Sequence, residues 1–255
     1  MTTYARYPSL QDTPVIISGG ASGIGESLVR NFAAQGAKVG FVDIQAERGQ
    51  QLADELTAAG QVAKFIACDI TDIAAYQAAI AAFATAHGDA LVLVNNAAHD
   101  QRHDWSEVTP AYWDDRMAVN LKHAFFAIQA VAPGMIAAKR GAIINTGSIS
   151  WMIMSPSIPV YETAKAATHG LTRSMARELG KHGIRVNSLV PGWIMTERQL
   201  THWLDDKAEK LIDASQALAG RVYPDDVSRM ALFLAAEDSA MISAQQFIVD
   251  GGWAN

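Results

Sequence analysis

Residues 15–25 read Val15-Ile16-Ile17-Ser18-Gly19-Gly20-Ala21-Ser22-Gly23-Ile24-Gly25, and a helical pattern continues over residues 26–30. A glycine-rich turn between a strand and a helix turns tightly, lets backbone amides approach a pyrophosphate, and points the helix N-terminus at its negative charge. The spacing of Gly19, Gly23 and Gly25 differs from the commonest dinucleotide fingerprint, so a plain structural turn is the alternative interpretation. The stretch predicts the first strand-helix unit of a parallel sheet and a candidate dinucleotide site.

The same alternation of short β-branched runs and helical segments continues from residue 14 to the end of the chain. Apolar runs such as 91–94 show no polar alternation, as expected for central strands covered by helices on both faces. We therefore predict an α/β fold, with one Rossmann-type, doubly wound parallel sheet of about seven strands and helices on both faces. The expected strands are 15–17, 38–42, 62–67, 91–94, 142–145, 185–189 and 246–249.

Length and composition fit one large domain. The chain has 255 residues and a mass of 27.4 kDa, and 50% of its residues are hydrophobic while 18% are charged. This is enough apolar material for a core on both sides of a sheet. No Pro/Gly/Ser-rich linker, charge block or repeat interrupts the series. We expect a single cofactor-binding and catalytic domain over 1–255, with 1–12 as an N-terminal arm and 196–220 as a helical insertion on the substrate side.

Charge and apolar patterning argue against several classes of protein. The chain has 20 basic and 26 acidic residues, and its net charge of −6 disfavours nucleic acid as a partner. No apolar stretch approaches the roughly eighteen residues that cross a bilayer, and the first residues lack a signal peptide's apolar core, so we expect a cytoplasmic protein without a membrane partner. The single Cys68 fits a reducing compartment, or is simply a small core residue. No cluster of His, Asp or Glu has metal-site spacing, so no metal is expected.

Polar residues end three of the expected strands. Asp43 lies eighteen residues past Gly25, about the separation at which a carboxylate accepts hydrogen bonds from the adenosine ribose of NAD. Its charge would repel the 2′-phosphate of NADP, and Ser22 offers no positive charge to hold one, so NAD is the expected cofactor. The alternative is that Asp43 caps the next helix. Asp69 and the pair Asn95-Asn96 end two further strands, although both residue types are common in turns.

A possible chemical centre is formed by Tyr161 and Lys165, with Ser148 thirteen residues before the tyrosine. Residues four apart share a helix face and lie about 6 Å apart along its axis. A phenol with a pKa near 10 is a poor base at neutral pH, and a neighbouring ammonium favours the phenolate. The Ser148 hydroxyl can bind the same substrate oxygen. Alone, a Tyr and a Lys four residues apart usually lie on a solvated helix face. Together with Ser148 and the candidate dinucleotide site, they favour proton abstraction from an alcohol that loses a hydride.

With these motifs the chain resembles the short-chain dehydrogenase/reductase superfamily over nearly its whole length. The resemblance implies a catalytic tetrad of Asn120, Ser148, Tyr161 and Lys165. Tyr161 would be the general base or acid, Lys165 would hold the nicotinamide ribose and lower the tyrosine pKa, and Asn120 would hold a water of the proton relay. The implied cofactor-binding residues are Gly19, Ser22, Gly23, Ile24, Gly25, Asp43, Asp69, Ile70, Asn96, Tyr161, Lys165, Pro191, Ile194 and Thr196.

Three positions depart from the family pattern, namely Ser18 in place of Thr, Ala98 in place of Gly and Gly147 in place of Ser. Alanine at position 98 would be strained if that position needs a positive φ. In the family the last strand, here within 247–252, usually packs at a tetramer interface, so the resemblance implies a homotetramer. The small residues Ala164, Ala166, Ala167 and Gly170 would let two helices pack closely between subunits, or would pack on the chain's own sheet.

Segments outside the shared motifs, 100–103, 112–116, 130–135, 147–151 and 198–199, resemble bacterial aldose 1-dehydrogenases of the D-xylose dehydrogenase type. This resemblance implies NAD-dependent oxidation of the C1 hydroxyl of a cyclic aldose to the aldonolactone. A pentose such as D-xylose is favoured, with L-arabinose, D-galactose and L-fucose as further candidates. The expected substrate-binding residues are His99, Arg102, Ser148, Ser150, Trp151, Tyr161, Trp193, Arg198 and Gln199, followed by Glu162 and Trp203. Each alone also fits a surface, core or interface position.

Two other functions stay open. The apolar stretch 152–159 would suit a 6-deoxy sugar or a larger alcohol, so a dehydrogenase of another polyol or secondary alcohol is the nearest alternative. The other is a non-catalytic NAD-binding sensor. Binding NAD alone does not require Ser148 or Tyr161, so the presence of both favours an enzyme.

Overall fold

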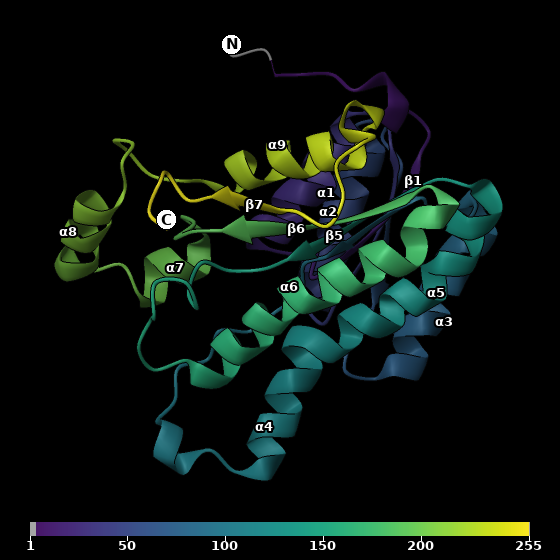
Figure 1. Cartoon of the computed structure of the whole chain (residues 1–255). Coiled ribbons are helices and arrows are strands. Elements are labelled where there is room, and N and C mark those ends of the chain that lie inside the picture. Colours follow the sequence, from purple (N-terminus) through teal and green to yellow (C-terminus); the bar gives the residue numbers. More distant parts are fainter. Residues whose placement is uncertain (1–3, 255) are drawn as a thin grey trace.

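The computed structural model describes residues 4–254, and residues 1–3 of the expected N-terminal arm lie outside them. Within that range, seven parallel strands form one sheet in the order β3-β2-β1-β4-β5-β6-β7 (Figure 1). This confirms the predicted α/β fold, and each expected strand is present with its ends shifted by at most two residues. The strands are β1 (Pro14–Ser18), β2 (Lys38–Asp43), β3 (Ala63–Ala67), β4 (Val92–Asn95), β5 (Gly141–Thr146), β6 (Ile184–Pro191) and β7 (Gln246–Val249).

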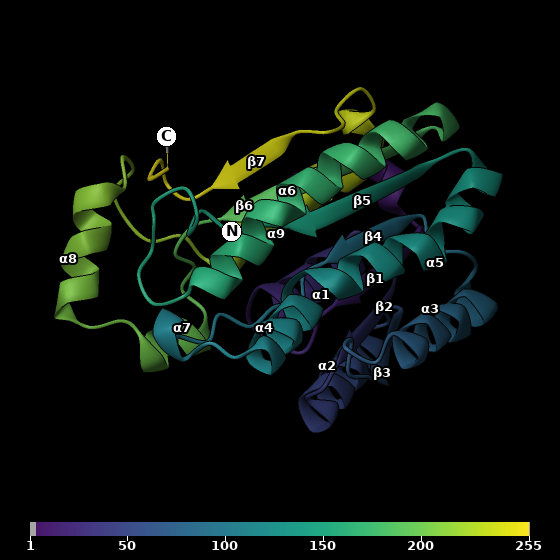
Figure 2. The same ribbon diagram turned by 60° about the horizontal axis from the view of Figure 1, so that its bottom comes forward.

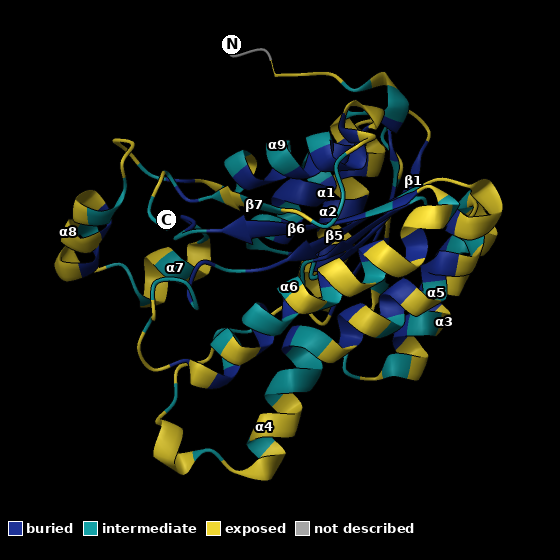
Figure 3. Ribbon diagram, in the orientation of Figure 1, coloured by how far each residue is buried: buried dark blue, intermediate teal, exposed yellow. Residues whose placement is uncertain are grey.

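Helices cover both faces of this sheet and enclose two hydrophobic cores (Figure 2). One core contains residues of α1 (Gly23–Ala34), α2 (Ala46–Ala58) and α9 (Pro224–Ala235). The other contains residues of α3 (Ile73–His87), α5 (His123–Ala138) and α6 (Pro159–Leu179). Figure 3 shows the strands as buried and the outer surfaces of the helices as exposed. The sheet is therefore a rigid, two-sided platform for the segments at its edge.

The central strands supply both cores because successive side chains point to opposite faces. In β1, Val15 and Ile17 belong to the core under α1, whereas Ile16 belongs to the core under α3 and α5. Both sets must be apolar, which is why these strands show no polar alternation. The short helix η1 (Pro8–Leu10) adds Leu10 to the first core, so this part of the expected arm is packed against the sheet layer.

One helical run, from α4 (Pro110–Met117) through the π-helical turn η3 (Ala118–Lys122) into α5, is long and apolar enough by length and composition to cross a membrane. Its 18-residue window has a mean hydropathy of 1.3 and is 39% buried. This departs from the expectation that no apolar stretch approaches that length. Ile128, Val131 and Met135 of this run are buried against the sheet, so its apolar residues have a place in the core.

The carboxyl ends of the strands define the functional edge. β1 and β4 are neighbours in the sheet but not in sequence, and such a switch point opens a crevice where ligands bind. The helices α7 (Glu197–His202) and α8 (Asp206–Ser215), both within the expected insertion, lie beyond this edge (Figure 1). The remaining short helices are η2 (Trp105–Glu107), η4 (Gly180–His182) and η5 (Glu237–Ser239).

Candidate active site

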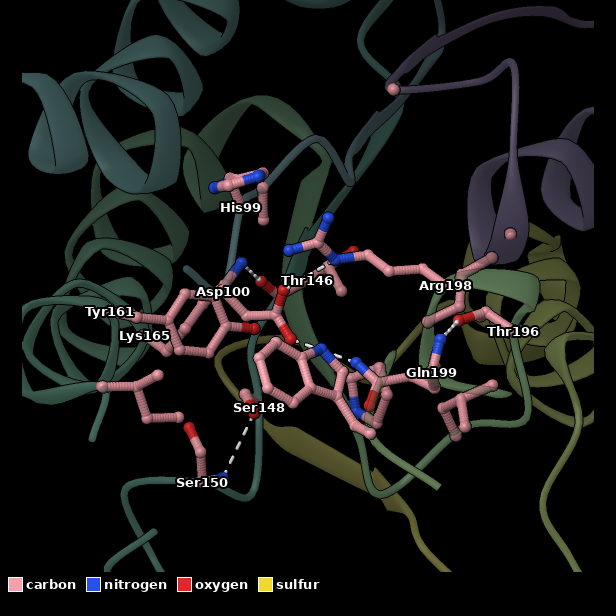
Figure 4. A pocket seen from close by; sticks show the side chains of 18 of the residues that line it. His99, Asp100, Thr146, Ser148, Ser150, Tyr161, Lys165, Thr196, Arg198 and Gln199 are labelled. Carbon is pink, nitrogen blue, oxygen red and sulfur yellow. Dashed lines mark hydrogen bonds and ion pairs between the residues drawn. The ribbon is translucent and has the colours of Figure 1, made fainter. Parts of the chain in front are cut away.

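A cleft of about 1490 Å³ runs along the carboxyl edge of the sheet (Figure 4). It is bounded by the glycine turn, by the loops that follow β2 to β6, and by α7. The cofactor-binding residues expected from the sequence all line it, namely Gly19, Ser22, Gly23, Ile24, Gly25, Asp43, Asp69, Ile70, Asn96, Tyr161, Lys165, Pro191, Ile194 and Thr196. The tertiary structure thus brings together residues spread over most of the chain.

The glycine turn leaves no room for side chains where a phosphate would approach. A Cβ on Gly25 would lie 1.7 Å from the carbonyl oxygen of Gly19, and a Cβ on Gly19, which has a φ of +68°, would lie 2.8 Å from Ala97 Cα. Ser22 is the N-cap of α1 but makes no side-chain cap bond within the described structure, so the first-turn amides face the cleft unused. Backbone amides at a helix N-terminus fit a pyrophosphate.

Asp43 is tied to this turn by its own carboxylate. Its Oδ2 accepts the amide of Ala21 and its Oδ1 accepts the amide of Gln45, both at 3.0 Å. The N-cap of α2 is Gln45, so Asp43 is not the cap of that helix. Asp43 is 7% exposed and lines the cleft; its Oδ1 also accepts from the Gln45 side chain at 3.3 Å, so Oδ2 is the oxygen that keeps an acceptor site. The site fits a ribose with free hydroxyls.

Asn96 and Ser18 fasten the start of the crevice. The Ser18 hydroxyl accepts the amides of Asn96 (3.0 Å) and Ala97 (3.1 Å), and the Asn96 side chain donates to the carbonyls of Ser18 and Gly19, both at 3.1 Å. Serine at position 18, where the family usually has threonine, therefore keeps the hydroxyl that accepts these two amides. Ala98 is not among the described residues with a positive φ, so alanine is unstrained there.

The expected adenine-site residue Asp69 is exposed at the far end of the cleft. Its Oδ1 accepts the amide of Thr71 at 2.9 Å and the Thr71 hydroxyl at 2.7 Å. The carboxylate therefore shapes its own turn, and its Oδ2 is left for a ligand. A turn residue and a cofactor-site residue, the two interpretations of Asp69 that the sequence left open, are therefore compatible.

Ser148, Tyr161 and Lys165 meet at the centre of the cleft (Figure 4). Ser148 follows β5, and the other two lie in the first turns of α6, as their spacing predicted. The Lys165 ammonium lies 5.6 Å from the centre of the Tyr161 ring and donates to the carbonyl of Thr146 at 2.8 Å. The Ser148 hydroxyl accepts the amide of Ser150 at 3.1 Å, which orients its hydrogen away from that amide. The three side chains can share one substrate oxygen and one ribose.

Burial dominates the titration of this centre. Burial raises the pKa of Tyr161 above its ordinary value, the negative charge of Asp100 raises it further, and the Ser148 hydroxyl opposes both. Burial lowers the pKa of Lys165 to about 8, although Asp100 acts in the opposite direction. Among the protein's own groups, therefore, no net lowering of the tyrosine pKa is achieved in the described structure. A cation bound beside the phenol would favour the phenolate.

Asn120 lies beneath the cleft floor, not in its lining, and is 2% exposed within the π-helical turn η3. Its Oδ1 accepts the amide of His99 at 2.8 Å, while its Nδ2 donates to the carbonyls of His99 at 3.2 Å and Arg116 at 2.9 Å. The amide side chain therefore makes its hydrogen bonds to the main chain of His99, in the loop after β4, and of Arg116 in α4. The expected role of Asn120, holding a water of the proton relay, stays a prediction. Single π-turns of this kind are frequent at functional sites.

Most of the expected substrate-binding residues also line the cleft, namely His99, Arg102, Ser148, Ser150, Tyr161, Trp193, Arg198, Gln199 and Trp203. Trp151 and Glu162 are outside its lining. Glu162 instead accepts the amide of Ser155 at 2.9 Å and so closes the loop between β5 and α6. From that loop, Ile153, Pro156 and Ile158 reach the lining, which gives the cleft part of the expected apolar wall.

Trp253 and Asp100 are among the lining residues that the sequence reasoning missed. Trp253 follows β7 and stacks on Trp193, with ring centres 6.4 Å apart and an interplanar angle of 17°. Trp253 lies just past the carboxyl end of β7. Because ligands bind at the carboxyl ends of strands in a parallel sheet, this position is the signal that could have identified it. Asp100 accepts hydrogen bonds from Arg198 (3.1 Å) and Gln199 (3.0 Å). It lay in a segment already noted, but no motif marked it as part of the site.

Among the described residues, no group of three or more His, Cys, Asp or Glu side chains is placed to hold a metal ion. The cleft presents hydroxyls, amides, indoles and charged groups, with two aromatic planes at one end. This is the chemistry of a dinucleotide and an alcohol side by side.

Comparison with known proteins agrees with this geometry. Residues 19–254 match the family described as enoyl-(acyl carrier protein) reductase. The chain is 45% identical over 249 residues to a D-xylose 1-dehydrogenase of Caulobacter vibrioides, covering 98% of each. It is 44% identical over 249 residues to a probable galactose dehydrogenase of Rhizobium meliloti, covering 97% of each.

Solved structures give the same result. A 3-oxoacyl-[acyl-carrier protein] reductase of Brucella melitensis with bound NAD superposes with a TM-score of 0.88 at 31% identity, covering 99% of this chain and 97% of the other. The two sequence relatives are named as dehydrogenases, and the solved structure, a reductase, shares the fold over nearly the whole chain. The chain therefore belongs to the short-chain dehydrogenase/reductase family of oxidoreductases.

Proposed function

We propose that this protein is an NAD-dependent aldose 1-dehydrogenase, which oxidises the C1 hydroxyl of a cyclic sugar to the aldonolactone. Two relatives at 44–45% identity over nearly the full length are named as dehydrogenases of D-xylose and galactose, and sugar dehydrogenase activity is the coarser conclusion they support. The observation that carries the proposal is the meeting of Ser148, Tyr161 and Lys165 with polar side chains and indoles in one cleft. A polyol needs such hydrogen-bonding groups, and its apolar ring faces suit indoles.

In the proposed mechanism the C1 hydroxyl lies between Ser148 and Tyr161. The Ser148 hydroxyl fixes the substrate oxygen, and the Tyr161 phenolate takes its proton as the C–H bond at C1 breaks. A nicotinamide cofactor held by the lining residues would supply the hydride acceptor, so the products would be the lactone, NADH and a proton. Lys165 holds the cofactor ribose and passes the proton on, and Asn120 holds the water that carries it towards solvent.

NAD is proposed over NADP because of the charge at the ribose end. The Asp43 carboxylate is held by two amides beside the glycine turn and would repel a 2′-phosphate. Arg48 also lines the cleft, but it pairs with Glu197 at 2.9 Å. A nicotinamide cofactor is the coarser conclusion, supported by the family and by the relative with bound NAD.

A pentose such as D-xylose is the proposed substrate, with L-arabinose, D-galactose and L-fucose as the other sugars to be tested. The second candidate is a different polyol or a larger secondary alcohol. It is favoured by the apolar lining residues Ile153, Pro156 and Ile158, and relatives at 33% and 39% identity are named as D-threitol and hydroxysteroid dehydrogenases.

The deciding experiment mixes the purified protein with NAD and each of these sugars, galactitol and a simple secondary alcohol, and follows NADH absorbance. Turnover of an aldose with lactone as product supports the proposal. Turnover of galactitol or the alcohol alone selects the second candidate. A non-catalytic sensor is selected if the protein binds NADH but turns over none of the compounds, and if Tyr161→Phe binds NADH as the wild type does.

We further propose one catalytic domain, a cytoplasmic location and a homotetramer. The sheet runs through nearly the whole chain, from Pro14 to Val249. On α6, Ala164 is fully buried in its own chain, whereas Ala166 and Ala167 are half-buried and Gly170 is exposed, so these three are available to face another subunit. Light scattering coupled to size-exclusion chromatography, which should give four times 27.4 kDa, tests the tetramer.

A further inference from the structure

The loop after β4 places an unassigned carboxylate, Asp100, inside the cleft. Its Oδ1 accepts from Nε of Arg198 at 3.1 Å, and its Oδ2 accepts from Nε2 of Gln199 at 3.0 Å. Both partners belong to α7, on the opposite side of the cleft mouth (Figure 4). The Asp100 side chain is 27% exposed, so it is shielded but reachable from the cleft.

Asp100 faces the groups that carry out the chemistry. Figure 4 shows its carboxylate among Tyr161, Ser148 and the two residues of α7. Asp100 lines the same cleft as Tyr161 and Lys165, and its charge raises the pKa of both. A substrate whose hydroxyl reaches Tyr161 therefore passes close to this carboxylate.

The position of Asp100 is set by the catalytic layer itself. The preceding residue, His99, is held through its main-chain amide and carbonyl by the side chain of Asn120 at 2.8 and 3.2 Å. Two residues later, the guanidinium of Arg102 lies 4.1 Å from the centre of the Trp203 ring. The carboxylate is thus held between the buried floor of the cleft and the α7 side, as a precise recognition group requires.

The lone pairs of Asp100 are only partly used. An ionised carboxylate accepts about four hydrogen bonds and donates none, and two of the four are taken by Arg198 and Gln199. Sugar hydroxyls are donors, and their bonds to a carboxylate are stronger than those between neutral groups. The carboxylate therefore has both the capacity and the partners for a polyol.

His99 complements it with a donor. Nδ1 of His99 lies 2.7 Å from Nη1 of Arg116, which can only donate, so Nδ1 accepts and the proton is on Nε2. Burial and the charges of Arg198 and Arg116 lower the pKa of His99, which keeps the ring neutral at pH 7. Adjacent residues thus offer an acceptor and a donor, the pair that neighbouring hydroxyls of a sugar ring need.

We propose that Asp100 is a specificity-determining substrate ligand, whose carboxylate accepts hydrogen bonds from ring hydroxyls next to the reacting C1. Gln199 and the loop that Asn120 anchors hold it in place, so the carboxylate stays in the cleft when Arg198 is replaced. The inference rests on the proposed aldose oxidation. Its consequence is selectivity for a hydroxyl over a hydrogen at one ring carbon, because a deoxy sugar leaves the carboxylate without its partner.

The competing interpretation is a purely structural bridge that holds α7 against the loop after β4. The two interpretations predict different substrate selectivity when Arg198 of α7, a partner of Asp100 in this bridge, is replaced. Arg198→Gln removes a charged partner of Asp100 but leaves the carboxylate in the cleft. Asp100→Asn keeps the size of the side chain and removes two acceptor sites.

The test measures kcat/KM of the wild type, Asp100→Asn and Arg198→Gln for the best aldose and for its 2-, 3- and 4-deoxy analogues. We expect the wild type to prefer the parent sugar over one analogue by about 10-fold or more, since the site is partly open to water. In Asp100→Asn, kcat/KM for the parent sugar and for that analogue should differ by about 2-fold or less. Arg198→Gln should keep most of the wild-type preference. NADH affinity and Tm should change little in either variant.

The outcomes separate the two proposals. Aldose turnover with the same ratio in Asp100→Asn as in the wild type overturns the role of Asp100 and leaves the proposed function standing. Equal loss of the ratio in Asp100→Asn and Arg198→Gln assigns both to a structural bridge and also overturns it. If the wild type oxidises no aldose, the proposed function fails and the role of Asp100 in sugar selectivity fails with it.

Discussion

The two halves of the cleft are built by different means. The cofactor half, around β1, α1 and β2, is fixed through main-chain groups. The carbonyl of Gly19 leaves no room for a Cβ on Gly25, and the side chains of Asp43 and Ser18 accept main-chain amides. The substrate half, formed by the loops after β4 and β5 and by α7, is fixed by side-chain pairs such as Asp100 with Arg198. Main-chain geometry is set by local sequence, whereas side-chain pairs between distant segments require the whole fold.

Among the described residues, the halves also differ in which polar atoms are left without a partner, namely main-chain amides in the cofactor half and side-chain atoms in the substrate half. Ser18 and Asn96 satisfy one another beside the glycine turn. On the substrate side, Ser150 Oγ, Trp193 Nε1 and Trp203 Nε1 are buried without a hydrogen-bond partner in the described structure. Buried unpaired polar atoms are costly, and they cluster where a ligand is to be recognised. This contrast suggests that substrate selectivity is the more easily altered property.

The largest expected effect is at the point where the halves meet. Tyr161→Phe removes the proposed base and should lower kcat for oxidation by about 1000-fold or more, within the range of general acid-base catalysis. NADH affinity, measured by fluorescence titration, should stay within about 3-fold, because the phenyl ring keeps its packing. Full turnover in this variant would remove Tyr161 from the mechanism.

Lys165→Met should separate catalysis from stability. Activity should fall by about 100-fold or more, whereas the free energy of unfolding should rise by about 1 to 3 kcal/mol, since burial holds the ammonium pKa at about 8, below its unfolded value. The unfolded chain then binds more protons between about pH 8 and 10.5. The gain should therefore be complete below pH 8 and shrink above it.

Urea unfolding of the wild type and Lys165→Met at pH 7 and pH 10 checks this. A variant less stable than the wild type at pH 7 would contradict the assigned cost of burying the ammonium.

In the cofactor half, Gly25→Ala should cost about 3 kcal/mol and weaken NADH binding about 10-fold or more, because its methyl group would overlap backbone. The matched control is Gly180→Ala, where an added Cβ meets nothing within 4 Å. Thermal unfolding and NADH titration of both variants provide the comparison. Equal effects in the two would show that the crowded turn has no special role.

Asp43→Ser should change cofactor choice with little change in sugar selectivity. We expect the ratio of kcat/KM for NAD over NADP to fall about 10-fold, as a carboxylate that repels a 2′-phosphate is lost. Asp54→Ser, on the exposed side of α2, is the control. An unchanged ratio in Asp43→Ser would count against the ribose role of Asp43.

The smallest expected effect is on the pH profile. Because burial and Asp100 raise the pKa of Tyr161, oxidation should accelerate as pH rises above neutral. Removing the negative charge in Asp100→Asn lowers that pKa and should move the rise in kcat/KM to lower pH by about half a unit. Profiles from pH 6 to 10 for both proteins test the sign, and a flat wild-type profile would argue against phenolate formation as a limiting step.

For the cofactor half, the sequence indicated residues that lie along the cleft, whereas their binding of the cofactor stays a prediction. Each expected cofactor-binding residue lines the cleft, since a glycine turn and strand ends are short-range patterns whose sheet position follows from the alternation of strands and helices. The substrate half was predicted less well. Trp151 and Glu162 stand outside the lining, and Asp100 and Trp253 were not expected within it. Whether a loop residue faces a cleft depends on loop conformation, which no periodicity encodes.

Asn120 illustrates the difference between identity and role. The motif placed it in the tetrad, but the structure shows its side chain bonded to His99 and Arg116 inside a π-helical turn. A one-residue insertion into a helix leaves no mark in hydrophobic spacing, and the partners of a buried amide come from the fold.

By itself, the sequence determined the parallel α/β fold, the glycine turn and the order of Ser148, Tyr161 and Lys165, because each depends on local spacing and on apolar runs that fix which strands are buried. Only the tertiary structure decided which side chains face one another across the cleft mouth, namely Asp100 with α7 and Trp193 with Trp253. These contacts join segments that are far apart in the chain. Their formation depends on the packing of every element between them.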